Sequence, residues 1–382
     1  MFNKKSVFWA ACSGLLLFGI GLITLGSVVS DLKLKFNLDE ISSGTLFSIM
    51  PIGILAGSLV FGPICDKYGY KLLLIFSCIF MFIGFEGIAY APDLSLLKLC
   101  VFFFGLGGGA MNGATNAVVS DISPKDKGAE LSILGVFFGI GALGMPMISG
   151  LLKNHLSFET ILGLVGLFTL AVAIFFGLIR FPEPKQKQGF PIRQSFLLLK
   201  DNLLLLIAFF LFCQSSFEAI INNWTTSFLV NRLAVDASEA LYALSLFIAG
   251  LTLMRLLTGT VLRKVNGFTI MFVSFGLILI GLLLLKTSTT ISIAMIALIL
   301  LGAGLAGGFP IMFGIVGNRY SKLSGTAFSF VLVIALLGNI LINYGMGIIA
   351  EQFGVQQVMN VALIELLIMI LLCLFIKRIN FK

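Results

Sequence analysis

The sequence predicts an all-α integral membrane protein with twelve transmembrane helices in two parallel six-helix repeats. Three observations carry this prediction. The 382 residues are 59% hydrophobic and 11% charged, with a mean hydropathy of +1.10, which is far from the composition of soluble domains. Apolar runs long enough to cross a bilayer recur twelve times, and the two halves share residues at one constant offset.

The twelve runs each approach or exceed the roughly 20 apolar residues that a spanning helix needs. They lie at 6–30, 42–64, 72–90, 94–120, 131–152, 160–180, 203–230, 238–262, 268–286, 290–317, 325–350 and 356–376. The first run exceeds the apolar core of a secretory signal and lacks a convincing cleavage site, so we expect a span.

The connections between the runs are short and leave no room for a soluble domain. The longest, 181–201, contains three prolines and several basic residues. We expect it to be a cytoplasmic linker between an N-terminal bundle at 1–180 and a C-terminal bundle at 202–382. Its second part, 192–200, is expected to form a short surface helix.

The positive charge follows the topology. Of the 25 Lys and Arg residues, 18 lie on alternate loops or at the two termini, and six lie on the opposite loops or helix ends. The positive-inside rule therefore places both termini in the cytoplasm, with the chain in a plasma membrane of the bacterial inner-membrane type. The net charge of +8 then needs no nucleic-acid partner, and we expect none.

The sequence shows no arrangement of residues that is typical of a catalytic or metal site. The six cysteines show no paired spacing, and His155, the one histidine, falls in an outer loop. We expect no disulfide, no metal site and no cofactor. We find no nucleophile–base pair and no phosphate-binding Walker loop, so we expect neither an enzyme nor an ATP-driven pump.

The two halves match at an offset of 197 residues without gaps across four helices. Gly53, Gly62, Lys67, Gly105, Gly107, Gly128, Ser132, Gly141 and Gly150 match Gly250, Gly259, Lys264, Gly302, Gly304, Gly325, Ser329, Gly338 and Gly347. Because six helices separate the copies, both have the same membrane orientation. Parallel repeats of this kind predict a mid-membrane site between the halves and a rocking motion of one half on the other.

The stretch Gln214 to Leu229 is the most polar part of any span. At helical spacing Gln214, Glu218, Asn222 and Thr225 share one stripe. A carboxylate in mid-membrane costs at least a few kcal/mol unless it is protonated, paired or in contact with water. We therefore predict that Gln214, Glu218 and Asn222 bind substrate and that Glu218 also carries a proton. The alternative is that these groups fix helix packing through hydrogen bonds.

Amides on two other spans are further candidates for substrate binding. Asn112, Thr115 and Asn116 form a stripe on the fourth span, and Asn339 and Asn343 lie on the eleventh. Amides both donate and accept hydrogen bonds, which suits a hydroxylated substrate. We predict binding roles for the four asparagines, with helix packing as the alternative.

Four more intramembrane residues have open roles. Trp224 can stack on a sugar face or an apolar substrate, or serve as an interfacial anchor. Arg255 can pair with a carboxylate as part of a gate, which we favour, or bind an anionic substrate. Glu86 can reach water at the outer end of its span, and we have no specific account of Glu365 beyond a pair or protonation.

The loop between the second and third spans reads GPICDKYGYK, from Gly62 to Lys71. It resembles the signature loop of the major facilitator superfamily, G-x-x-x-D-R-x-G-R-K, with Lys67 in place of Arg and Tyr70 in place of the second basic residue. The resemblance implies the major facilitator fold for the whole chain. It also implies a cytoplasmic latch, so we assign gating to Asp66 and Lys67. The second copy, from Gly259, carries Arg263 where the first carries Asp66.

Within that family, three stretches resemble the fucose–proton symporter group of sugar transporters. They are FEAIINNWTTSFL in the seventh span, GLGGGAMNGATN from Gly105 to Asn116, and GGFPIMFG from Gly307 to Gly314. The acids that fucose symporters carry on helices one and four have no counterpart here, so proton coupling would run through Glu218. Na⁺ remains open as the coupling ion.

The fifth span, GVFFGIGALGMPMISG from Gly135 to Gly150, does not decide the direction of transport. It resembles the Gly-Pro motif of proton antiporters, but Met145 interrupts that motif, and symporters and small-residue packing give similar spacing.

The leading hypothesis is a secondary transporter that moves a small polar solute, a sugar or related compound, by proton-coupled alternating access. The runner-up is proton-coupled efflux of amphipathic drugs or other small metabolites, which the 38 phenylalanines favour. A receptor or scaffold would not need Glu218 in mid-membrane. The expected partners are a small-molecule substrate, a proton or Na⁺, and the lipid bilayer, and we expect a monomer.

Overall fold

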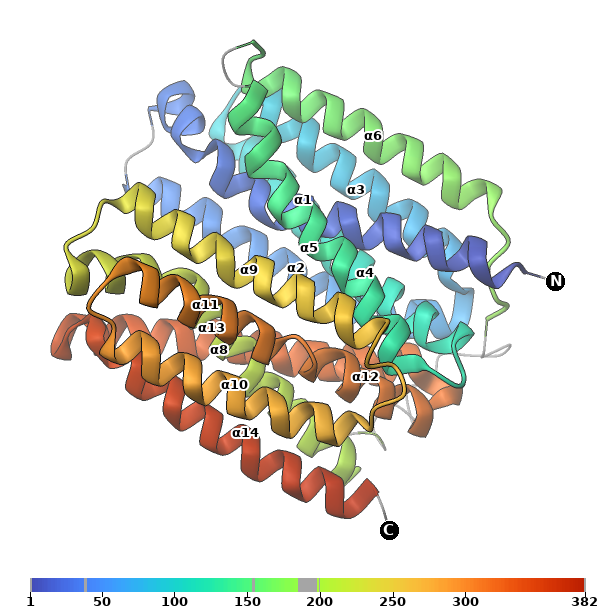
Figure 1. Ribbon diagram of the computed structural model, residues 1–382. Coiled ribbons are helices and arrows are strands. Elements are labelled where there is room, and N and C mark those ends of the chain that lie inside the picture. The colour runs from blue at the N-terminus through green and yellow to red at the C-terminus, as the bar shows by residue number, and fades with distance from the viewer. Residues whose placement is uncertain (1, 38–39, 153–154, 185–197, 199, 381–382) are drawn as a thin grey trace. The chain divides into compact units, whose positions relative to one another are not determined.

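The computed structural model describes residues 2–37, 40–152, 155–184, 198 and 200–380. In this part of the chain the regular structure is entirely helical (Figure 1). The helices are α1 (Lys4–Phe36), α2 (Glu40–Tyr68), α3 (Tyr70–Tyr90), α4 (Leu94–Ile122), α5 (Lys127–Leu152), α6 (Phe158–Leu178), α8 (Asn202–Leu233), α9 (Ala237–Gly259), α10 (Gly267–Thr287), α11 (Ile291–Leu305), α12 (Gly308–Arg319), α13 (Ser324–Phe353) and α14 (Val358–Asn380). Two short 3₁₀ helices, Ser321–Leu323 and Val355–Gln357, precede α13 and α14.

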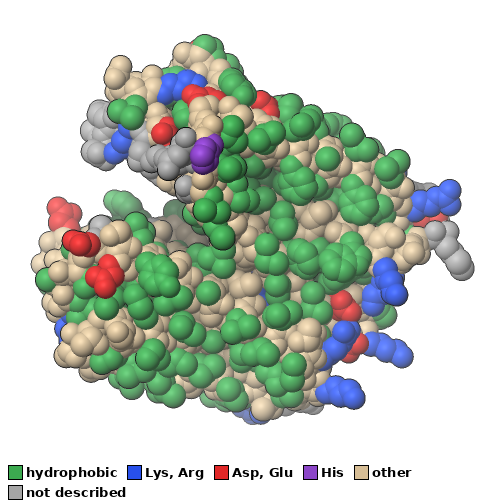
Figure 2. All heavy atoms as spheres, turned by 45° about the horizontal axis from the view of Figure 1, so that its top comes forward, with side chains coloured by type: hydrophobic (Ala, Val, Ile, Leu, Met, Phe, Trp, Pro, Cys, Tyr) green, Lys and Arg blue, Asp and Glu red, His purple; other side chains and the backbone are tan. Residues whose placement is uncertain are grey.

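Twelve helical segments in the described residues are long and apolar enough to cross a membrane. Each corresponds to one predicted run, which confirms the all-α fold class and the number of spans. Hydrophobic side chains cover much of the surface seen in Figure 2. On α6, for example, Leu164, Leu167 and Ile174 are exposed, as expected for side chains that face lipid.

Polar side chains mark where several helices begin. The Asn3 Oδ1 atom accepts a hydrogen bond from the Lys5 backbone N–H at the start of α1 (2.9 Å). Asp93 does the same for Leu96 at the start of α4 (2.9 Å), and Asp201 for Leu203 at the start of α8 (2.9 Å). These caps satisfy backbone donors that have no partner within their own helix.

The chain forms two compact units, each of which takes one helix end from the other half of the sequence. The first comprises Met1–Pro124, Phe137–Ile192 and Tyr320–Ser329, and therefore includes the start of α13. The second comprises Lys125–Val136, Arg193–Arg319 and Phe330–Lys382, and therefore includes the start of α5. The surface helix predicted at 192–200 lies almost entirely outside the described residues.

Matched glycines make the same backbone contacts in both units. A Cβ on Gly53 would overlap the carbonyl oxygen of Phe102, and a Cβ on Gly250 would overlap that of Ile299, exactly 197 positions further along. Gly105 and Gly302 likewise lie against the carbonyl oxygens of Met50 and Phe247.

Since only glycine permits these approaches, α4 packs closely on α2 in the first unit, and α11 packs closely on α9 in the second. Gly107 and Gly304 extend the correspondence, because they lie against the carbonyl oxygens of Ser77 and Ser274. The glycine pattern of the repeat is therefore a pattern of helix packing.

The tenth span differs from the single run predicted at 290–317. It is interrupted, because α11 ends at Leu305 and α12 begins at Gly308. Pro310 has no backbone N–H with which to continue the helical ladder through this point. The sequence around the break, GLAGGFP, contains the responsible residues, but glycine and proline also occur inside continuous transmembrane helices.

Candidate functional site

The polar stripe of α8 divides into buried and partly accessible residues. Gln214 is 1% exposed and Thr225 is fully buried, whereas Glu218, Asn222 and Trp224 are half-buried. Gln214 Nε2 donates a hydrogen bond to the carbonyl oxygen of Leu305, the last residue of α11 (2.9 Å). This hydrogen bond joins α8 to the break in the tenth span. The sequence pattern did not indicate this contact.

Glu218 lies on α8 in the same unit as Arg255 of α9, and the two side chains interact electrostatically. Among the described residues, no direct ion-pair contact joins them. Asn222 Nδ2 donates to the backbone carbonyl of Glu218 (2.9 Å), so the amide turns back along its own helix. A carboxylate and a guanidinium therefore lie in the same apolar bundle. Charged groups in such surroundings are costly, and they commonly mark a functional site in a membrane protein.

Arg255 is 8% exposed, and its environment explains one glycine of the fifth span. Its Nη1 donates to the carbonyl oxygen of Gly135, which lies within α5 (3.4 Å). A Cβ on Gly135 would lie 2.8 Å from Arg255 Cδ, so a larger residue there would force the Arg255 side chain to shift. Arg255 Nε is buried and finds no hydrogen-bond partner among the described residues.

On α4, two of the three predicted polar residues act together. Asn116 Nδ2 donates to the backbone carbonyl oxygen of Asn112 (2.8 Å) and to the side-chain Oδ1 of Asn112 (3.0 Å). Both side chains are half-buried. Thr115 is fully buried and donates to the carbonyl of Met111 (2.8 Å). The asparagines thus form a polar pair on one side of α4, while Thr115 belongs to the interior of the first unit.

The remaining predicted binding residues lie on α8 and α13. Trp224 approaches α13 in the second unit, since a Cβ on Gly347 would lie 3.8 Å from its ring. Asn339 is half-buried on α13. The side chain of Asn343 is outside the part of the chain that the structure describes.

The signature loop binds the beginning of α13. Asp66 is 1% exposed, and its Oδ2 accepts hydrogen bonds from the Thr326 backbone N–H (2.8 Å) and hydroxyl (2.7 Å). Its Oδ1 accepts from the Gly325 N–H (3.3 Å). A carboxylate in this position satisfies free backbone donors and interacts favourably with the helix dipole. Lys67 lies over the Tyr68 ring, 4.9 Å from its centroid.

Tyr70, which replaces a basic residue of the family signature, has a contact of its own. Its hydroxyl donates to Asp121 Oδ2 (2.5 Å), and Ser324 Oγ donates to Asp121 Oδ1 (2.8 Å). Asp121 therefore links α3 to the residue that opens α13. Sequence reasoning missed Asp121, although its position at the end of the fourth span was a usable signal.

The second copy of the loop binds the beginning of α5 with reversed charge. Arg263 donates from Nη2 to Glu130 Oε1 (2.6 Å) and to Asp126 Oδ2 (3.1 Å). The hydrogen bond that Arg263 donates to Glu130 is the main cause that raises the pKa of the Arg263 guanidinium above its usual value. Lys127 Nζ donates to the Gly317 carbonyl near the end of α12 (2.6 Å). The sequence showed only that Arg263 stands in this copy where Asp66 stands in the first.

Comparison with known proteins identifies the class. The family model of the Major Facilitator Superfamily matches residues 11–341, so the chain belongs to this superfamily of secondary transporters. It is a multi-pass membrane protein. The expectation of a transporter rather than an enzyme is confirmed, because the family consists of transporters.

The similar proteins are named as transporters of different solutes. A probable nitrate transporter, NarT of Staphylococcus haemolyticus, is 24% identical over 326 residues, which cover 82% of each chain. The crystal structure of the E. coli fucose:proton symporter FucP superimposes with a TM-score of 0.82, at 17% identity, over 97% of this chain and 98% of that one. The proton:xylose symporter XylE gives the same TM-score at 14% identity, over 98% and 95%. At such identities the two structures support the fold alone.

Proposed function

We propose that the protein moves a small polar solute, a sugar or related compound, across the plasma membrane by proton-coupled alternating access. The observation that carries this proposal is the half-buried Glu218 beside Arg255 inside an apolar bundle. A carboxylate that can lose and gain a proton there changes the charge of the site during each cycle. The Asn112–Asn116 pair adds donors and acceptors suited to hydroxyl groups.

We further propose that residues 1–180 and 202–382 are the two moving bundles, with 181–201 as linker, and that both termini are cytoplasmic. The gating assignment to Asp66, Lys67 and Arg255 belongs to the same proposal. The contact of Asp66 with the start of α13 supports it, because a latch must bind a helix end that it can also release. The likeness to FucP is compatible with the fucose-symporter branch.

An anionic solute is the second candidate. Arg255 is buried, its Nε lacks a partner in the described structure, and a guanidinium is well suited to bind carboxylate or an oxyanion. The relatives named as probable nitrate transporters favour the same class.

The test is thermal stabilisation of the purified protein against sugars, nitrate, carboxylates, amino acids, nucleosides and lipophilic cations. A ligand at a hundred times its dissociation constant adds about 2.7 kcal/mol to the free energy of unfolding. A sugar that stabilises wild type but not Asn116→Ala supports the first proposal. An anion whose effect is lost in Arg255→Gln supports the second, and a lipophilic cation sensitive to Trp224→Ala favours efflux.

A further inference from the structure

One buried carboxyl group has no place in the transport site. Glu365 lies on α14 and is 5% exposed. Its Oε1 shares a short hydrogen bond with the hydroxyl of Ser216 on α8. Its Oε2 is buried and finds no hydrogen-bond partner in the described residues.

The hydroxyl of Ser216 serves two acceptors. Ser216 Oγ lies within hydrogen-bond distance of the Cys213 carbonyl oxygen (2.9 Å) as well as of Glu365 Oε1. A serine hydroxyl has one proton to donate. If Glu365 were ionised, Ser216 could satisfy only one of these two oxygens.

A proton on Glu365 Oε1 resolves this conflict. The Glu365 O–H then donates to Ser216 Oγ, and the Ser216 O–H donates to the Cys213 carbonyl. Both hydrogen bonds are made, and the oxygen left without a partner belongs to a neutral acid instead of a buried anion, which costs far less free energy.

The charges around Glu365 do not offer an alternative partner. α14 packs on α8, α10 and the 3₁₀ helix Val355–Gln357. From α8 the neighbouring titratable group is Cys213, which interacts with Glu365 electrostatically. α10 carries one charged residue, Lys286, and its ammonium donates to Asn360 Oδ1 (2.8 Å) near the end of the bundle.

The charged residues further along these helices are engaged elsewhere. On α14, Lys377 lies over the Phe272 ring, 5.2 Å from its centroid, and is roughly 18 Å of helix away from Glu365. On α8, Glu218 interacts with Arg255, and Arg232 donates to the Ser288 carbonyl (3.2 Å). No cation in the described residues forms an ion pair with Glu365.

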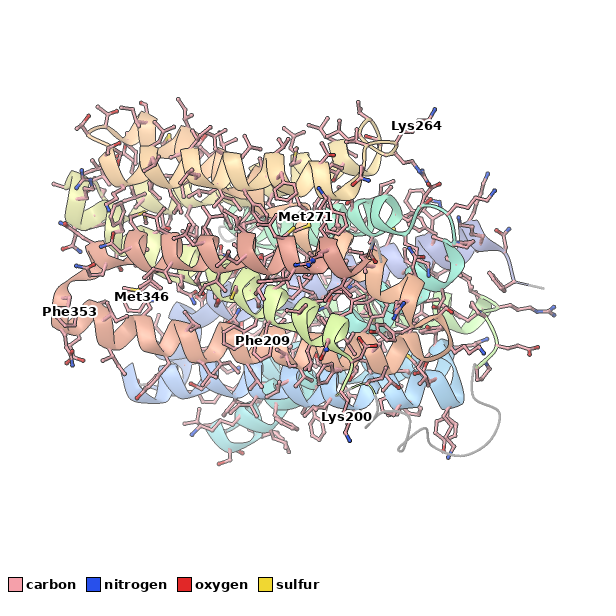
Figure 3. All side chains as sticks on the ribbon, turned by 90° about the horizontal axis from the view of Figure 1, so that it is seen from below. Lys200, Phe209, Lys264, Met271, Met346 and Phe353 are labelled. Carbon is pink, nitrogen blue, oxygen red and sulfur yellow. The ribbon has the colours of Figure 1, made fainter. Side chains whose placement is uncertain are left out.

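A small cavity lies one helical turn from Glu365 and contains further unsatisfied polar atoms. Met369 of α14 and Met271 of α10 line it, together with Gln214 and Ser274. Figure 3 shows Met271 beside α14. Gln214 Oε1 and Ser274 Oγ are buried without partners among the described atoms, which is the setting in which proteins hold an ordered water.

We propose that Glu365 is a proton-binding site inside the C-terminal bundle. While α8 and α14 are packed together, the proton is bound to Glu365 Oε1 and hydrogen-bonded to Ser216 Oγ. When the site opens, the O–H bond of the acid breaks and the proton passes to water, which leaves a carboxylate. The chain then has a second intramembrane acid besides Glu218. Proton binding at Glu365 does not depend on the solute, and only its use in coupling rests on the proposed function.

The first test uses dicyclohexylcarbodiimide, which reacts with protonated carboxyl groups in apolar surroundings. The full-length protein is labelled in detergent over a range of pH, and the modified peptide is identified by mass spectrometry. We expect label on the Glu365 peptide at neutral pH, its decline as the pH rises, and its loss in Glu365→Gln. The exposed Glu239 of α9 should stay unlabelled under the same conditions.

The second test does not depend on access of the reagent. Gln at position 365 can replace the neutral acid, since its amide N–H can donate to Ser216 Oγ. We expect Glu365→Gln and wild type to unfold at the same temperature at acid pH, where the carboxyl group is protonated in both the folded and the unfolded chain. As the pH rises, the unfolded chain releases this proton first, so wild type alone should lose stability relative to Glu365→Gln, and the difference should still be growing at neutral pH.

An ionised Glu365 predicts the opposite. The difference in unfolding temperature between wild type and Glu365→Gln would then stop growing below neutral pH, because the folded and the unfolded chain would both have lost the proton. That result would overturn the proposal whether or not any solute is found, and a failed solute screen with a protonated Glu365 would count against the proposed function alone.

Discussion

Asp66 and Arg263 occupy matching positions of the two repeats, and each binds the beginning of a helix from the other half of the sequence. Asp66 accepts hydrogen bonds from the first residues of α13, whereas Arg263 donates to the acidic residues that precede and open α5. A carboxylate suits free N–H groups, and a guanidinium suits acidic side chains. Both copies of the loop therefore bind the beginning of a helix, the first through a carboxylate and the second through a guanidinium.

We expect Asp66→Ala to lower the free energy of unfolding by about 2 kcal/mol, because buried N–H groups of α13 lose their acceptor. Transport should be lost together with stability. Thermal unfolding and uptake measure the two effects. The matched control is Asp93→Ala, which removes an exposed cap of α4 and should leave transport intact. Equal transport defects in both variants would contradict a gating role.

The Arg263 contact should affect stability much less. Arg263 and Asp126 are partly exposed, with 35% and 49% of their side chains accessible, and exposed ion pairs contribute about 0–1 kcal/mol. The Arg263 guanidinium is charged throughout the neutral range, as arginine is in general, so the pair should not respond to pH there. We expect Arg263→Glu to impair transport with little loss of stability, and Glu130→Arg in the same chain to restore part of it. If Glu130→Arg restored no transport, the ion pair between these two positions would not be required for transport.

Glu218 carries the residue-scale prediction for coupling. Glu218→Gln should abolish accumulation driven by a pH gradient, because the side chain no longer exchanges a proton, while solute exchange in proteoliposomes continues. Glu239→Gln, on the exposed beginning of α9, is the matched control and should behave as wild type. Normal accumulation by Glu218→Gln would show that Glu218 is not the proton carrier.

At the scale of helices, the glycine contacts lead to a paired prediction. Gly105→Val and Gly302→Val should both destabilise the protein, by about 1–3 kcal/mol or more, because each side chain would overlap a backbone carbonyl. Gly276→Ala on α10 is the control, since a Cβ there meets nothing within 4 Å. It should be neutral or slightly stabilising in thermal unfolding. If only one of the valine variants were destabilised, the two glycines would not be equivalent.

Periodic and local features of these elements could be predicted from the sequence, and long-range contacts could not. Run length gave every span, and the spacing of Gln214, Glu218 and Asn222 placed them on one stripe. At the break between α11 and α12, Leu305 accepts a hydrogen bond from Gln214, which lies 91 positions earlier. The close contact at Gly135 is made by Arg255, 120 positions away. Such partners leave no periodic signal in a single sequence.

For the whole molecule, the offset of 197 residues relates helix contacts in the two repeats as well as matching residues. The contacts of Gly53, Gly105 and Gly107 recur in the second unit at partners that are themselves displaced by 197 residues. The two repeats therefore share one packing plan, and because six spans separate them we expect them to have the same orientation in the membrane. Their boundaries at 180 and 202 and the position of the substrate site remain predictions.

Topology is the whole-molecule property that labelling can decide. Lys264 and Phe353 lie toward opposite ends of the second unit in Figure 3, and the positive-inside rule assigns the Lys264 end to the cytoplasm. The six native cysteines are buried, so an impermeant maleimide should report mainly on introduced ones. In intact cells Glu351→Cys, at the exposed end of α13, should react at once. Lys264→Cys should react only after the membrane is opened, and the reverse order would invert the topology and place the Asp66 latch on the outer side.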